Sequence, residues 1–102
     1  MVYNKLVRDK IPAIIRAQGK TPHTRVLDDA DYTRYLECKL DEEVTEYHKD
    51  RNLEELADIL EVVYALAENL GCSKEDLMKT YQKKHDDRGG FHDRILLISN
   101  EG

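Results

Sequence analysis

The 102 residues suffice for one small domain with a limited core, so we expect copies of the chain to associate and bury more surface. The chain is 36% charged and 40% hydrophobic with clear periodicity, which favours a folded protein with a charged surface over a disordered chain. A net charge of −5 disfavours nonspecific binding to nucleic acid, and no apolar run approaches membrane-spanning length.

The front of the chain predicts an extended segment over residues 1–7 and a short helix over residues 9–18. Asp9 is a candidate N-cap, Pro12 is tolerated in the first turn, and Gly19 ends the helix. Residues 23–27 are too short for a helix and predict a linker or a short strand.

The middle of the chain predicts an antiparallel helical hairpin. Asp28 or Asp29 caps a long helix that extends to about residue 50, and a second helix covers residues 53–70 and ends at Gly71. Arg51 and Asn52 form a tight break between the two helices, which favours antiparallel packing.

The last third predicts a fourth helix over residues 74–87, which opens with a cap signal at Ser73 and Asp76. Residues 95–98 then form a short strand or a tail that docks on a partner subunit. The expected fold is all-α: one domain over residues 1–102, with a helical hairpin and flanking helices completed into a bundle by oligomerisation, and with short terminal strands.

Cys38 and Cys72 lack metal-ligand spacing and are interpreted as packing residues of a reduced, cytoplasmic protein without a signal peptide.

Two carboxylate pairs lie where the hairpin helices should be apolar. At about 100° per residue, Glu43 and Glu46 project among the apolar side chains of the first helix. Glu55 falls inside the apolar arc of the second helix, and Asp58 lies on the border of that arc. Such crowded carboxylates need a positive partner. Three other acidic residues fall on a separate face that we expect to be solvated: Glu54, Glu61 and Glu68.

The hairpin should bring both pairs to similar heights, because each lies within about three turns of the break. A single such pair is common on charged helices, but two pairs on consecutive helices indicate a site for Mg²⁺ or Mn²⁺. A ferritin-like di-iron site would need Glu-x-x-His motifs, which these helices lack. A magnesium site of this kind favours phosphoanhydride hydrolysis, with Glu43 or Glu46 activating the attacking water. Glu42 is a further ligand or a partner for Lys39.

Basic residues gather towards both ends of the chain, and a fold that brings them over the acidic middle would hold a metal and a polyanion. Four are predicted to contact substrate phosphates: Arg8, Lys39, Lys83 and Arg88. Arg88 is favoured because Gly89 and Gly90 let backbone amides approach an anion. The alternative for Lys83 and Arg88 is an interaction with the dipole of their own helix.

Two segments, KLDEEVTE at residues 39–46 and EELADILE at residues 54–61, resemble the signature of the MazG-type all-α nucleoside triphosphate pyrophosphohydrolases. That superfamily includes the phosphoribosyl-ATP pyrophosphohydrolase of histidine synthesis. KLVRDKIP at residues 5–12 and RGGF at residues 88–91 resemble a small single-domain MazG-like subgroup. The resemblance implies cleavage between the α- and β-phosphates of a nucleotide, and it implies these magnesium ligands: Glu43, Glu46, Glu55 and Asp58.

The preferred interpretation is a magnesium-dependent nucleotide pyrophosphohydrolase that forms a homodimer or homotetramer and binds neither nucleic acid nor membrane. Phosphoribosyl-ATP hydrolysis is an alternative, although the opening at residues 5–12 looks foreign to that enzyme. A noncatalytic acidic helical adaptor is a further alternative, and it predicts no stabilisation by metal. The interval between the two acidic motifs is shorter than in many MazG members, which leaves less helix around a base pocket.

Overall fold

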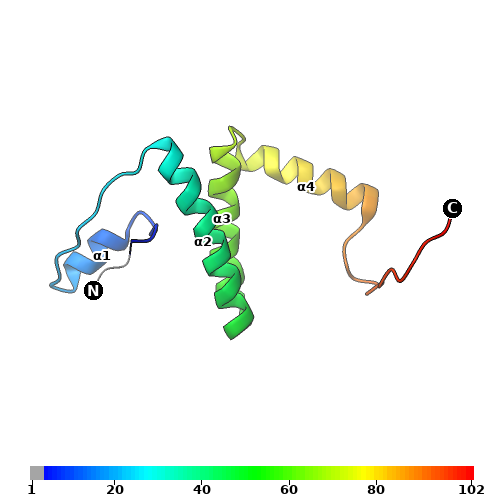
Figure 1. The fold of residues 1–102 in the computed structure, drawn as a ribbon, viewed down its shortest axis with the longest axis horizontal. Helices are drawn as coiled ribbons and strands as arrows, with labels where there is room; N and C mark the ends of the chain where they lie inside the picture. The colour runs from blue at the N-terminus through cyan, green and yellow to red at the C-terminus, as the bar shows by residue number, and fades with distance from the viewer. Residues whose placement is uncertain (1–3) are drawn as a thin grey trace.

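The computed structural model describes residues 4–102 and contains four helices in that range (Figure 1). They are α1 (Ile11–Ala17), α2 (Asp29–Asp50), α3 (Leu53–Asn69) and α4 (Lys74–Arg88). The predicted all-helical class and the helical hairpin are confirmed. No strand forms within residues 4–102, so the expected terminal strands are not found there, and the first part of the expected extended segment lies outside the described residues.

The centre of the molecule is the antiparallel hairpin of α2 and α3, which lie side by side along their lengths (Figure 1). The Asp28 carboxylate caps α2 by accepting a hydrogen bond of 2.8 Å from the backbone N–H of Asp31. Asn52 caps α3 in the same way, with the N–H of Glu55 at 2.9 Å. Arg51 connects the helices in the left-handed conformation, at φ 49°, which allows a connection of minimal length.

The buried core of the described chain is a narrow seam between these two helices. Its members are Leu36, Val62 and Ala67, which are 2%, 7% and 7% exposed. Leu56 and Leu60 on α3 remain 45% exposed, which leaves one side of the hairpin open. The radius of gyration is 18.0 Å, whereas a compact domain of this length has about 13 Å. The single chain therefore leaves much apolar surface unburied.

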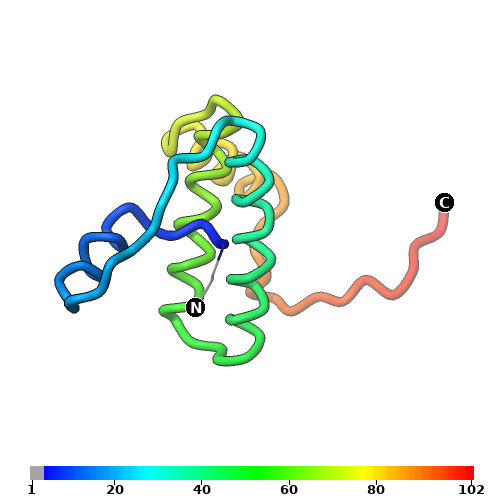
Figure 2. The backbone as a smooth tube through the Cα atoms, turned by 60° about the vertical axis from the view of Figure 1, so that its left-hand side comes forward, coloured from blue at the N-terminus to red at the C-terminus, as the bar shows by residue number. Residues whose placement is uncertain are grey.

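The N-terminal segment, residues 4–10, crosses the hairpin before α1 begins (Figure 2). The expected N-cap at Asp9 is wrong: Lys10 occupies the cap position without a side-chain hydrogen bond. The N–H of Ile11 donates to the carbonyl of Arg8 at 3.0 Å. This turn places Lys10 in helical geometry, so the chain has no extended residue from which Asp9 could cap the helix.

Helix α4 begins with the predicted capping box, in which Ser73 and Asp76 exchange hydrogen bonds of 2.9 and 3.1 Å. In the described part of the chain, α4 contacts α3 and no other helix, and it projects away from the hairpin (Figure 1). Residues 95–98 are extended and between 75% and 89% exposed, so this chain does not itself cover them. No helix among residues 4–102 has the length and apolar character needed to span a bilayer.

Candidate metal centre

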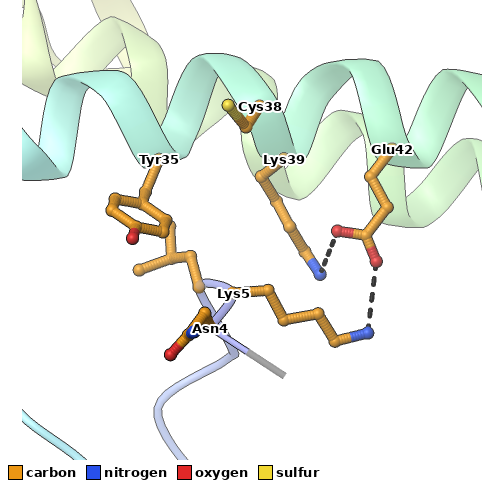
Figure 3. A pocket seen from close by; sticks show the side chains of 7 residues that line it. Asn4, Lys5, Tyr35, Cys38, Lys39 and Glu42 are labelled. Atoms are coloured by element: carbon orange, nitrogen blue, oxygen red, sulfur yellow. Dashed lines mark hydrogen bonds and ion pairs between the residues drawn. The ribbon is translucent and has the colours of Figure 1, made fainter. Parts of the chain in front are cut away.

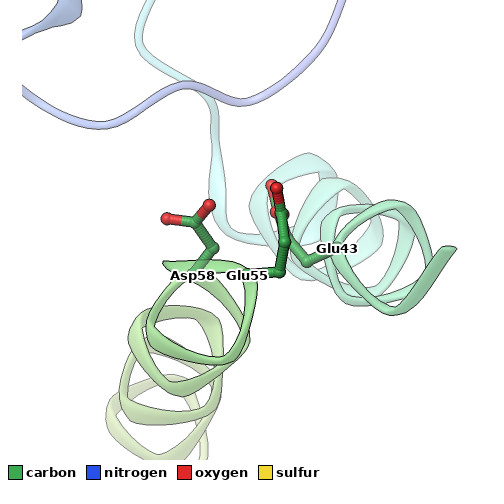
Figure 4. Close-up of side chains that lie close together, drawn as sticks. All are labelled: Glu43, Glu55 and Asp58. Carbon is green, nitrogen blue, oxygen red and sulfur yellow. The ribbon is translucent and has the colours of Figure 1, made fainter. Parts of the chain in front are cut away.

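Three of the four predicted metal ligands converge in the half of the hairpin nearest its connection (Figure 4). Glu43 from α2 and Glu55 and Asp58 from α3 each offer a carboxylate oxygen, and these oxygens lie within 4.8 Å of one another. Glu43 is only 9% exposed, and the other two are partly buried. We call these three residues the carboxylate triad. Their approach follows from the short connection, which holds the two acidic motifs at matching heights.

The fourth predicted ligand, Glu46, belongs to a neighbouring group. Its carboxylate, with those of Asp50 and Glu55, forms a second set of oxygens within 4.8 Å of one another. Glu55 is therefore shared between the two groups. Asp50 was missed by the sequence analysis, although it lies four residues after Glu46 and so shares its helix face.

Glu55, which belongs to both groups, is repelled by the neighbouring carboxylates. Partial burial raises the pKa of its carboxyl above the ordinary value of 4.5. Negative charge on its acidic neighbours, foremost Asp50 and Asp58, raises that pKa further. No ion pair with Glu55 occurs in the part of the chain that the structure describes, so this carboxylate is available to a cation.

The other two triad members already face positive side chains. An Nη2 atom of Arg8 lies 2.6 Å from Oδ1 of Asp58, and Nζ of Lys39 lies 3.3 Å from Oε1 of Glu43. The structure thus places two of the four predicted phosphate-binding residues directly on the triad. Arg8 reaches it from the N-terminal segment, and Lys39 reaches it from α2.

Glu42 contacts two basic side chains, Lys5 and Lys39 (Figure 3). It accepts hydrogen bonds from Lys5 at 3.2 Å and from Lys39 at 3.5 Å, so its predicted pairing with Lys39 is confirmed. Partial burial acts to raise the pKa of Glu42, but the hydrogen bond from Lys5 and the charges of Lys39 and Lys5 lower it below its ordinary value. Glu42 therefore stays ionised and anchors Lys39 and Lys5.

A hollow of about 320 Å³ lies between the N-terminal segment and the hairpin. Two triad members, Glu43 and Asp58, form part of its wall, together with Arg8 and Lys39. Two tyrosines also line it, Tyr32 and Tyr64. Pockets of about 300 Å³ and more accommodate small molecules.

The hollow corrects one expectation about the acidic residues. Glu61 and Glu68 are exposed as predicted, but they border the same hollow as the triad and do not form a separate face. Partial burial raises the pKa of the Tyr32 phenol, and the charges of Glu68 and Asp9 add to this effect. Tyr32 therefore offers a hydroxyl donor to a ligand at neutral pH.

The predicted phosphate contacts on α4 are not brought to the hollow within one chain. Lys83 and Arg88 are exposed and do not line it. Nζ of Lys83 lies 3.9 Å from a carboxylate oxygen of Asp87 on the same helix. The two cysteines, Cys38 and Cys72, are exposed free thiols, so the interpretation of these residues as buried packing groups is wrong.

The residues of the triad fit a hard divalent cation. All donors are carboxylate oxygens, with no imidazole or thiolate in either acidic group, which suits Mg²⁺ or Mn²⁺ better than zinc. The unpaired Glu55 supplies negative charge that Arg8 and Lys39 leave uncompensated.

Comparison with known proteins adds one partial relative. An uncharacterised protein of Mycolicibacterium smegmatis is 57% identical over 42 residues, which make up 41% of this chain and 43% of that protein. The chain thus matches less than half of that protein's length, and its name gives no activity. No family model and no solved structure matches this chain.

Proposed function

We propose that this protein is a Mg²⁺-dependent nucleotide pyrophosphohydrolase, which hydrolyses a nucleoside triphosphate to a nucleoside monophosphate and pyrophosphate. The carboxylate triad of Glu43, Glu55 and Asp58 carries the proposal, because it meets basic side chains at the wall of a hollow of small-molecule size. The resemblance of both acidic motifs to MazG-type enzymes points to the same chemistry.

The triad would hold the ion, with Glu46 beside it, and Mn²⁺ would serve in place of Mg²⁺. A bound Mg²⁺ neutralises phosphate charge and helps to orient the reacting groups. Arg8 and Lys39, which both line the hollow, would donate hydrogen bonds to phosphate oxygens. Of the two predicted catalytic carboxylates, Glu46 is better suited to orient or deprotonate water, because Glu43 is buried and paired with Lys39.

The functional unit in this proposal is a homodimer or homotetramer. A second copy packs on the open side of the hairpin, where Leu56 and Leu60 are half exposed, and completes a bundle of helices. Lys83 and Arg88 keep their predicted role only if α4 of one copy reaches the hollow of the other. The free thiols suit the reducing cytoplasm, which we propose as the location.

A panel of nucleoside triphosphates tests this function, with Mg²⁺ present and with pyrophosphate and monophosphate detected separately. We expect equal amounts of both products from at least one nucleotide, and neither product after Glu43→Gln. Glu54→Gln is the matched control, because Glu54 is exposed on the same helix and lies outside both the triad and the wall of the hollow. Release of orthophosphate in place of pyrophosphate would reject the proposed bond cleavage. No hydrolysis, combined with no stabilisation by metal, would favour the adaptor.

A further inference from the structure

The basic partners of the triad stand where a metal ion would need to compete with them. The Arg8 guanidinium is 2.6 Å from Asp58, and the Lys39 ammonium is 3.3 Å from Glu43. Both carboxylates belong to the triad, and both cations also line the hollow. The same two side chains therefore face a metal-binding group on one side and a ligand-sized space on the other.

We propose that Arg8 and Lys39 are exchangeable cations: they neutralise Asp58 and Glu43 in the metal-free protein, and an arriving divalent cation takes over this role and leaves their positive charge for a polyphosphate in the hollow. This inference rests on the proposed metal-dependent function. It adds that metal and polyphosphate promote each other's binding through these two side chains. Each ligand must then raise the affinity for the other by the same factor.

Arg8 is placed to move. It lies on the N-terminal segment, outside any helix, and its side chain is 55% exposed. Ion pairs as exposed as this one contribute little in water. A divalent ion carries twice the charge and engages several carboxylates at once. The exchange therefore costs little at Asp58 and frees a planar guanidinium, which suits phosphate oxygens.

Lys39 differs from Arg8 because it has a second anchor. Its side chain is 17% exposed, and its ammonium also lies 3.5 Å from Glu42. Loss of the contact with Glu43 leaves the one with Glu42, so Lys39 stays at the wall of the hollow with its charge less neutralised. Arg8 thus provides the larger movement, and Lys39 provides a fixed positive charge.

Calorimetric titration of EDTA-stripped protein with Mg²⁺ alone tests the exchange. Arg8→Gln should bind Mg²⁺ about two- to fivefold more tightly than wild type, because the ion no longer displaces a weak ion pair. Arg16→Gln is the matched control, with the same loss of charge on exposed α1, and it should change nothing. Lys39→Gln is a second variant, and it should also bind Mg²⁺ more tightly than wild type.

A double-mutant cycle separates direct exchange from a general charge effect. In the Asp58→Asn background, Arg8→Gln should no longer alter Mg²⁺ affinity, because the displaced contact is already absent. Inorganic triphosphate added with saturating Mg²⁺ should bind more weakly to Arg8→Gln than to wild type.

Three outcomes overturn the exchange: no gain in Mg²⁺ affinity, a loss of it, or a gain that Arg16→Gln reproduces. Wild type that binds Mg²⁺ and hydrolyses nucleotides, while Arg8→Gln shows no gain, would reject the exchange and leave the proposed function intact. Wild type that binds no Mg²⁺ would reject both.

Discussion

The strongest test of the carboxylate triad is the substitution Glu43→Gln. Glutamine keeps the volume of the side chain and an oxygen that can accept a hydrogen bond from Lys39, but it removes one negative charge. Without metal, two effects oppose each other: repulsion from Glu55 and Asp58 is relieved, and the ion pair with Lys39 is weakened. We therefore expect the metal-free unfolding free energy to stay within about 1 kcal/mol of wild type.

With metal, the thermal midpoints of wild type and Glu43→Gln should differ clearly. Mg²⁺ at about ten times its dissociation constant stabilises the native state by about 1.4 kcal/mol. For 102 residues, an unfolding entropy of about 0.21 kcal/mol/K converts this to a rise of about 7 °C in the thermal midpoint. If Glu43→Gln weakens binding about tenfold, the same Mg²⁺ concentration leaves about 0.4 kcal/mol, or about 2 °C.

Circular dichroism melts of EDTA-stripped protein, with and without millimolar Mg²⁺, measure this difference. Glu61→Gln should show the full rise of the wild type, because Glu61 is exposed and outside the triad. A Glu43→Gln protein that keeps the full metal-induced rise would refute the role of Glu43 as a ligand. A thermal midpoint of the wild type that does not change with Mg²⁺ would refute the metal centre itself.

Three further outcomes are expected. Leu36→Ala should lower the free energy of unfolding by about 3 kcal/mol, because Leu36 is 2% exposed in a small core. Urea unfolding would show this loss as a lower midpoint at unchanged slope. A loss under about 1 kcal/mol would mean that the seam does not support the fold. Because folding raises the pKa of Glu55, its protonated carboxyl stabilises the metal-free protein fully when the pH is below the ordinary pKa of 4.5. This contribution is lost as the pH rises through the raised pKa. Unfolding in EDTA from pH 4 to 7 should therefore show Glu55→Gln gaining stability relative to wild type as the pH rises, and a constant difference would contradict the shift. Arg88→Ala should leave the Mg²⁺ affinity of the free protein unchanged in calorimetry, since Arg88 lies outside the hollow. A loss of Mg²⁺ affinity as large as that caused by Glu43→Gln would mean that Arg88 supports the assembly around the site.

Local signals in the sequence were sufficient for the starts of α2, α3 and α4 and for the approach of the two acidic motifs. Caps at Asp28 and Ser73 and the break at Arg51 act within a few residues, so these starts could be predicted from the chain alone, whereas the cap expected for α1 at Asp9 was wrong. Counting along the two helices also predicted that Glu43 would be buried, as it is. Its role as a ligand stays a prediction.

Features set by tertiary structure could not be predicted in this way. The path of residues 4–10 over the hairpin decides that Arg8 meets Asp58, and helical periodicity contains no information about that path. The same segment forms part of the wall of the hollow, which Glu61 also borders. Helix α4 contacts α3 and no other described helix, so Lys83 does not reach the wall of the hollow, where it was expected.

The connection between α2 and α3 has a consequence for engineering the chain. Only Arg51 and Asn52 lie between the helices, so the connection has little length with which to absorb an insertion. One residue inserted into the first turn of α3 would turn the positions after it by about 100° and shift them by about 1.5 Å. That change would carry Glu55 and Asp58 away from Glu43. Reporter groups, affinity handles or new chain ends belong instead in the exposed stretches at residues 18–26 and 89–102, where added length leaves the hairpin register untouched.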